Sequence, residues 1–167
     1  NYVSLDKEKL EGILPLIARY NAEVILSVTG PTALNSTEDI LKSAAVLVSA
    51  ANESGISNKH IIIDPGVLHV TSDVGQRHTR TLIELLPALS EIFDPPIRTT
   101  AWINNVSAGA PRRLRPVINN TFLAMLAGVG LSSAFVDALN KGNMRTVRLI
   151  RILRDDAIYS DRDIELC

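Results

Sequence analysis

The sequence has little of what would connect it to a disulfide, a membrane or a nucleic acid. Its 167 residues include one cysteine, Cys167 at the last position, so no disulfide framework and no cysteine metal site are expected. Basic and acidic side chains number 17 and 18, a balance that gives no nucleic-acid signal. No apolar run approaches the roughly 20 residues that span a bilayer, and no signal-peptide pattern opens the chain. These absences predict a cytoplasmic protein.

Apolar residues, by contrast, are plentiful. They make up 46% of the chain, enough for the core of one globular domain that covers residues 1–167. Short β-branched runs alternate with helical spacings. Such alternation predicts parallel βαβ units and an α/β fold. The expected elements, in order, are a strand end at 1–4, a helix at 5–20 that Pro15 kinks or splits, a strand at 23–28, a helix from the capping box at Ser36 to about Gly55, a strand at 60–66, a helix through 82–93, a strand at 99–107, a helix from Pro116 to Gly128 or Gly130, a strand at 131–137 and a helix at 144–155.

The number of predicted strands is too small for a complete barrel. Five strands cannot close an eight-stranded (β/α) barrel, which typically needs about 250 residues. The chain is therefore either an open sheet or a fragment of a larger barrel.

Two predicted strands end in polar side chains. Asp64 precedes Pro65, and Asn104 and Asn105 follow the apolar run that begins at Thr99. The carboxyl ends of parallel strands are where α/β proteins bind ligands. A carboxylate can accept two hydrogen bonds side by side, and an amide can donate and accept. The alternative interpretation is that Asp64 caps the loop and Asn105 closes a turn.

Basic residues gather in the loop after Asn105. Arg112, Arg113 and Arg115 are either solvated or form a rim that meets an acidic partner or a carboxylated ligand. His60 and His69 have no metal-ligand spacing with an acid or a cysteine, so no metal site is expected.

Two segments carry a resemblance to a known family. Trp102 to Ser107 and Ile118 to Met125 resemble the seventh β/α unit of the methyltetrahydrofolate:corrinoid protein methyltransferases, relatives of dihydropteroate synthase and of the folate domain of cobalamin-dependent methionine synthase. From Asn1 to Tyr159 the chain resembles units four to eight of that TIM (β/α)8 barrel. The resemblance favours a barrel fragment that lacks the first three strands.

The resemblance also implies a function. The family moves the N5 methyl group of methyltetrahydrofolate, its substrate, to the cobalt of a corrinoid (cobalamin) carried by a partner protein. It implies that Asp64, Asn1, Asn105 and Ser107 bind the pterin and that Asn105 hydrogen-bonds to N5. A homodimer is expected, and the metal belongs to the corrinoid partner. The carboxylated ligand that Arg112, Arg113 and Arg115 would meet is then the glutamate tail of the folate. The segment from Val74 to His78 also resembles the family, and Gln76 and His78 are expected to anchor a loop.

Two other functions stay open. One is a non-catalytic barrel scaffold that docks a corrinoid protein, which the small number of strands favours. The other is a dihydropteroate synthase-like pterin enzyme. Those synthases carry a Ser-Arg-Lys type motif at the end of strand seven, whereas this chain has Asn104-Asn105-Val106-Ser107 there. Methyl transfer is therefore the stronger prediction.

Overall fold

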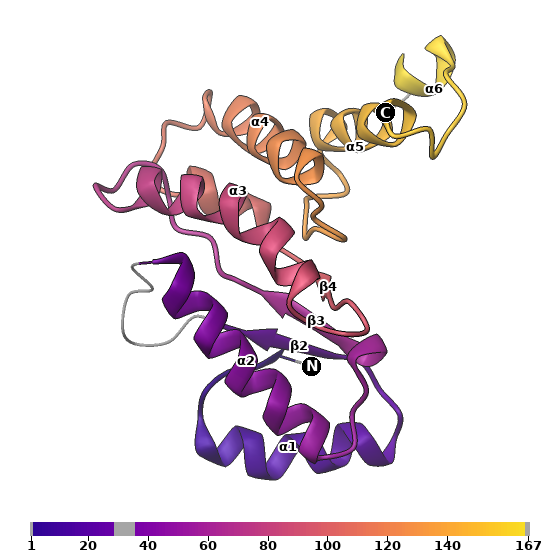
Figure 1. Ribbon diagram of the computed structural model, residues 1–167. Coiled ribbons are helices and arrows are strands. Elements are labelled where there is room, and N and C mark those ends of the chain that lie inside the picture. The colour runs from indigo at the N-terminus through magenta and orange to yellow at the C-terminus, as the bar shows by residue number, and fades with distance from the viewer. Residues whose placement is uncertain (1, 29–35, 166–167) are drawn as a thin grey trace.

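All four strands of the sheet run parallel to their neighbours. The computed structural model describes residues 2–28 and 36–165 (Figure 1). The spatial order β1-β2-β3-β4 is the same as the order along the chain. The strands are β1 (Tyr2–Val3), β2 (Val24–Ser27), β3 (Ile61–Asp64) and β4 (Arg98–Thr99).

A helix follows each strand, as the alternation predicts. Consecutive helices contact each other, α1 with α2, α2 with α3, α3 with α4 and α4 with α5, and Figure 1 shows this succession beside the strands. An unreversed strand order with successive helices is the arrangement of a TIM barrel, whereas a doubly wound sheet reverses its strand order. The helices are α1 (Lys7–Arg19), α2 (Thr37–Glu53), α3 (Gly75–Glu91), α4 (Arg115–Gly128), α5 (Lys141–Leu153) and α6 (Asp161–Glu165), with short 3-10 helices η1 (Asn58–His60) and η2 (Ile103–Ser107).

Local sequence signals explain how α2 begins and ends, whereas the signal inside α1 did not act as predicted. The Ser36 hydroxyl accepts a hydrogen bond from the Asp39 N–H at 3.1 Å, so the predicted cap begins α2. Gly55, with a φ of +90°, lies just beyond its end. The predicted split at Pro15 is wrong, because α1 runs unbroken from Lys7 to Arg19. Pro15 is exposed, and the helix continues through it although its nitrogen has no hydrogen to donate.

The two faces of the sheet differ in burial. Val24, Leu26, Ile61 and Ile63 are fully buried and belong to one hydrophobic core. The alternate positions of β2, Ile25 and Ser27, are only partly buried. Because successive side chains of a strand point to opposite faces, one face holds the core and the other is more open. The chain therefore forms part of a barrel wall.

The strand predicted at 99–107 is much shorter than expected. β4 contains only Arg98 and Thr99, and Thr100 N–H donates the last bond toward β3, to the Ile63 carbonyl at 2.8 Å. β3 ends at Asp64 and is followed by Pro65, which has no N–H to continue the ladder. The chain then turns into η2, so Asn105 lies in a 3-10 helix and not at a strand end.

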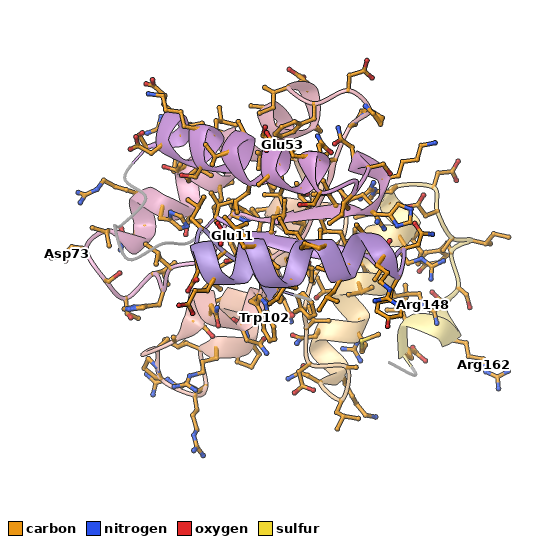
Figure 2. All side chains as sticks on the ribbon, turned by 90° about the horizontal axis from the view of Figure 1, so that it is seen from below. Glu11, Glu53, Asp73, Trp102, Arg148 and Arg162 are labelled. Atoms are coloured by element: carbon orange, nitrogen blue, oxygen red, sulfur yellow. The ribbon has the colours of Figure 1, made fainter. Side chains whose placement is uncertain are left out.

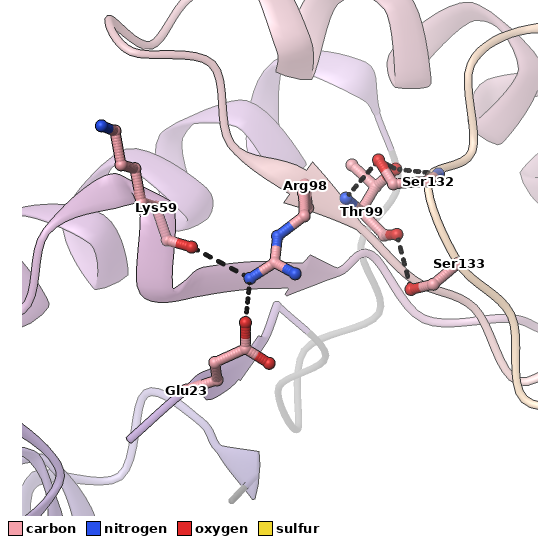
Figure 3. A network of polar contacts seen from close by, with 6 residues as sticks. All are labelled: Glu23, Lys59, Arg98, Thr99, Ser132 and Ser133. Atoms are coloured by element: carbon pink, nitrogen blue, oxygen red, sulfur yellow. Dashed lines mark hydrogen bonds and ion pairs between the residues drawn. The ribbon is translucent and has the colours of Figure 1, made fainter. Parts of the chain in front are cut away.

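The strand predicted at 131–137 is replaced, among the described residues, by an extended segment with an isolated bridge between Trp102 and Phe135. Ser133 N–H donates to the Thr99 carbonyl at 3.0 Å, and Phe135 N–H donates to the Ala101 carbonyl at 2.9 Å. Figure 3 shows how side chains add to this pairing: Thr99 N–H donates to the Ser132 hydroxyl at 3.1 Å. The segment occupies the fifth position of the sheet, beside β4.

A polar cluster lies at the amino ends of the strands, at the other end of the sheet from Asp64. The Arg98 guanidinium donates to the Glu23 carboxylate and to the Lys59 carbonyl, the latter at 2.9 Å (Figure 3). Glu23 precedes β2 and Lys59 precedes β3, so the contacts join the amino ends of neighbouring strands. The hydrogen bond from Arg98 lowers the pKa of Glu23. Contacts at this face of a barrel generally serve stability.

The C-terminal helices extend the molecule to one side. α5 contacts α4 and α6 contacts α5, and Figure 1 shows both beyond the sheet. Arg148 and Arg162 lie at this end in Figure 2. No helix within the described residues has the length and apolar character needed to cross a bilayer.

Candidate functional site

Asp64 is the central residue of the carboxyl end of the sheet. Its side chain is 4% exposed. One carboxylate oxygen, Oδ1, accepts from the Gly66 N–H at 2.9 Å, and Oδ2 accepts from the Tyr2 hydroxyl at 2.9 Å. Tyr2 belongs to β1, which is separated from β3 by β2. A carboxylate can accept about four hydrogen bonds, so Asp64 can accept further donors from a ligand.

Trp102, in the segment that follows β4, extends this hydrogen-bond chain. Its indole N–H donates to the Tyr2 oxygen, and its ring stacks on Phe135 at 4.5 Å between centroids. The Tyr2 ring also lies next to both of these rings, with a centroid-to-centroid distance of 6.3 Å to Trp102 and 6.2 Å to Phe135. Trp102 is 43% exposed and is labelled in Figure 2. Side chains from β1, from the carboxyl end of β3 and from the segment after β4 are thus joined through Tyr2, Asp64 and Trp102.

The electrostatics of Asp64 follow from its burial. Burial raises the pKa of the carboxyl, while the hydrogen bonds from Gly66 and Tyr2 act in the opposite direction. The pKa of Tyr2 is raised, first by burial and then by the neighbouring Asp64 charge. Tyr2 therefore remains a hydrogen-bond donor at neutral pH, and Asp64 presents an acceptor in a low-dielectric environment.

The loop after Asp64 is held by a buried histidine. Gly66 adopts a φ of +78°, and His78 Nε2 bonds to its carbonyl at 3.1 Å. A carbonyl can only accept, so Nε2 carries the proton. This confirms the expectation that His78 anchors a loop. Gln76 is exposed.

Asn105 lies on η2, which starts directly after Trp102. Its N–H donates to the Trp102 carbonyl at 3.1 Å, and the Val106 carbonyl accepts from Val70 N–H at 2.9 Å. The second bond attaches η2 to the loop that follows β3. Asn105 itself is exposed. The structure therefore places it at the same end of the sheet as Asp64.

A separate polar pocket of about 390 Å³ lies beyond η2. Ser107, Arg112 and Arg115 contribute to its wall, while Arg113 is not among the lining residues. The candidate residues thus fall into two groups, Asp64 with its hydrogen-bond chain and the residues of this pocket, with η2 between them. Asn1 lies outside the described residues. The pocket is lined by Asn104, Ser107, Ala108, Arg112, Arg115, Pro116, Asn119, Asp137, Asn140 and Asn143.

Tyr2 and Trp102 are the contributors that the sequence interpretation missed. Aromatic residues make up only 4% of the sequence, with a single tryptophan. Trp102 directly precedes the Ile-Asn-Asn run, and this scarcity was a signal that could have identified it. Nothing in the sequence marks Tyr2 as a neighbour of Asp64, 62 positions away. Within the described ranges, no cluster of three or more His, Cys, Asp or Glu residues could hold a metal ion.

Comparison with known proteins gives curated relatives and solved structures that share the fold. No family model matches the chain. A methylcorrinoid:tetrahydrofolate methyltransferase of Eubacterium limosum is 24% identical over 151 residues, which are 88% of this chain and 54% of that protein. The chain therefore spans about half the length of this relative.

Two dihydropteroate synthases share the fold. The Xanthomonas albilineans enzyme, solved with 4-aminobenzoic acid, has a TM-score of 0.69 at 16% identity and covers 95% of this chain and 60% of its own. The Coxiella burnetii enzyme, solved with pteroic acid, has a TM-score of 0.68 at 16% identity, with coverages of 93% and 62%. The chain thus has the fold of part of a dihydropteroate synthase-type barrel, which confirms the predicted partial TIM barrel.

Proposed function

We propose that this chain is the pterin-binding part of a methyltransferase that moves the N5 methyl group of methyltetrahydrofolate to the cobalt of a corrinoid protein. The observation that carries the proposal is Asp64, a buried carboxylate with two fixed hydrogen bonds at the carboxyl end of a strand. The curated relative supports this proposal, since its name joins tetrahydrofolate to a corrinoid. That name gives the reverse direction, and one site catalyses both directions of a reversible transfer.

Asp64 is assigned to the pyrimidine edge of the pterin. That edge presents a ring N–H and an amino group side by side, which suits the two oxygens of a carboxylate. Gly66 and Tyr2 already bind one lone pair on each oxygen and so fix the plane of the carboxylate. Asn1 and Ser107 are proposed as further pterin contacts. Because the plane of the Asp64 carboxylate is already fixed, less conformational entropy is lost when the pterin binds.

Asn105 is assigned to N5. Its amide can hydrogen-bond to N5 and favour the protonated form, so that the nitrogen leaves as a neutral amine when the methyl carbon is transferred. The carbon–nitrogen bond breaks with its electron pair on N5, and the Co(I) corrinoid of the partner supplies the pair that binds the methyl group. The chain itself contributes binding, orientation and the hydrogen bond at N5.

Partners follow from the same proposal. The corrinoid, with its metal, belongs to a partner protein, and the methyltransferase is expected to be a homodimer. The second candidate function is a non-catalytic barrel scaffold that docks a corrinoid protein. The observation in its favour is that the described residues form a sheet of four strands, half the number of a TIM barrel. A scaffold has no need of a pterin site, and this difference separates the two.

Methyl transfer with an Asn105→Ala variant tests the proposal. The assay follows the absorbance change of a Co(I) corrinoid protein mixed with methyltetrahydrofolate. Removal of the hydrogen bond to N5 is expected to lower the rate about 100-fold and to weaken methyltetrahydrofolate binding much less. Asn52→Ala, an exposed substitution on α2, is the control. Full activity of Asn105→Ala would contradict its role, and absence of any pterin binding by the wild type would favour the scaffold.

A further inference from the structure

The polar pocket beyond η2 has the chemistry of a binding site for an anionic ligand. Its volume of about 390 Å³ lies within the range of small-molecule pockets. Its wall contains two guanidinium groups, of Arg112 and Arg115, against one carboxylate, that of Asp137. The wall therefore carries a net positive charge, although the whole sequence has a formal net charge of −1.

Local structure fixes part of this positive wall. Arg115 Nε donates to the Ala110 carbonyl at 2.9 Å, which holds the guanidinium beside the pocket. Arg115 is also the first residue of α4, and no side chain caps that end of the helix. Pro116, in the first turn, lines the pocket. The positive end of the helix dipole thus adds to the charge of the arginines.

A buried amide on the same wall supplies an independent observation. Asn119 is 8% exposed, and its Nδ2 donates to Asn104 Oδ1 at 3.0 Å. Its own Oδ1 is buried and has no hydrogen-bond partner among the described residues. An unpaired buried acceptor is unfavourable, and a bound molecule that supplies the donor is one explanation for such a group in a native protein.

The pocket is connected to the Asp64 group through η2. Trp102, which precedes η2, is hydrogen-bonded to Tyr2 and through it to Asp64. Ser107, the last residue of η2, lines the pocket and donates to the Asn104 carbonyl at 3.3 Å. The short helix η2 thus lies between two groups of residues. The Asp64 group is suited to a ring that carries N–H donors, and the pocket with Arg112 and Arg115 is suited to a carboxylate.

We propose that this pocket binds the end of a ligand that combines a carboxylate with an amide N–H, the chemistry of an N-acylated amino acid. The carboxylate pairs with Arg112 and Arg115, and the N–H donates to Asn119 Oδ1. Two sources share this chemistry. One is the p-aminobenzoylglutamate tail of a folate seated at Asp64, which rests on the proposed function. The other is a free N-acylated amino acid.

Calorimetric titration with p-aminobenzoylglutamate, which has no pterin ring, tests the pocket directly. Wild-type protein is expected to bind it, and the Arg112→Ala/Arg115→Ala double variant is expected to bind about tenfold more weakly, as befits two partly exposed ion pairs. Arg113→Ala removes the same charge from outside the pocket and is expected to leave the affinity unchanged. The single Arg112→Ala variant, which keeps the Arg115 bond to Ala110, should show a smaller loss. Equal affinities of wild type and double variant, or no binding at millimolar concentration, would overturn the proposal.

Two further ligands identify the source. N-acetylglutamate that binds as tightly as p-aminobenzoylglutamate indicates a free acylated amino acid, whereas much weaker binding indicates the folate tail. A 6-methylpterin without a tail should bind equally to wild type and double variant. Loss of 6-methylpterin binding in Asp64→Asn reports on the pterin site alone. The pocket and the proposed function can therefore fail separately.

Discussion

The Tyr2 hydroxyl donates a hydrogen bond to Asp64 Oδ2 at 2.9 Å, across the strand that separates β1 from β3. Tyr2 in turn accepts from the Trp102 indole N–H. Burial raises the pKa of Asp64, and this hydrogen bond is one of two that oppose the rise. Tyr2 therefore helps to keep a buried carboxylate ionised, which is the form that accepts hydrogen bonds from a pterin.

Tyr2→Phe is expected to change the pH dependence of pterin binding. Without the hydroxyl, the pKa of Asp64 rises further, so protonation begins at a higher pH. Pterin affinity, which requires the ionised form, should then be lost at a higher pH as the pH falls. The affinity at pH 8 should change much less, because the Gly66 N–H still holds the carboxylate. Dissociation constants measured from pH 8 to pH 5 check this. Identical profiles for variant and wild type would show that Tyr2 does not act on Asp64.

Asp64→Asn is expected to raise the thermal stability at neutral pH. Because the folded-state pKa of Asp64 lies above its ordinary value, the folded protein binds the proton more tightly than the unfolded chain, and the carboxyl favours folding at low pH. This contribution is lost as the pH rises through the folded-state pKa. The neutral amide avoids that loss, so the melting temperature at pH 7 should rise by about 2–4 °C for each 1 kcal/mol gained.

The comparison of melting curves at pH 7 and pH 4 checks the sign. The advantage of Asp64→Asn should shrink at pH 4, where the wild-type carboxyl approaches its protonated form. An advantage that is equal at both pH values, or a lower melting temperature at pH 7, would contradict the description of Asp64 as a carboxylate whose ionised form is unfavourable for folding.

Gly75→Ala is expected to disrupt the loop between β3 and α3. A Cβ at this position would lie 1.8 Å from the His69 carbonyl oxygen, so the backbone must shift, at a loss of about 2–4 kcal/mol in the free energy of unfolding. Gly12, inside α1, is the matched control because a Cβ there meets nothing within 4 Å. Gly12→Ala should gain about 0.5–1 kcal/mol. Urea unfolding measures both, and equal stability of the two variants would show that the close approach at Gly75 is absent.

The order of helices and strands could be predicted because each depends on local signals. The strands β2 and β3 were visible as β-branched runs. The Ser36 side chain caps α2 as the sequence predicts, and α4 ends at Gly128. The lengths of β4 and of the segment at 131–137 could not be predicted. They depend on whether a neighbouring strand supplies donors and acceptors, and Pro65 removes that supply beside β4.

The candidate site was predictable in part. Asp64 could be located because it ends a strand next to a proline. Its partner Tyr2 could not, since the contact depends on a barrel geometry that brings β1 within reach of β3. The division into an Asp64 group and a separate arginine pocket was also hidden, because the contact between Asn104 and Asn119 requires the path of the loop that joins η2 to α4. The roles of Asn1, Asn105 and Ser107 stay predictions.

The most direct test of the account is the fluorescence of Trp102, the single tryptophan of this sequence, during titration with methyltetrahydrofolate. Trp102 is joined to Asp64 through Tyr2, so a pterin bound at Asp64 should change its emission in a saturable manner. N-acetyltryptophanamide corrects for absorption by the ligand. The account predicts saturation in the wild type and an affinity at least about tenfold weaker in Asp64→Asn, because a hydrogen bond to a charged group is worth about 1.5–3 kcal/mol. A wild type that does not saturate, or an Asp64→Asn variant that binds as tightly, would contradict the assignment of Asp64 as the pterin-binding carboxylate.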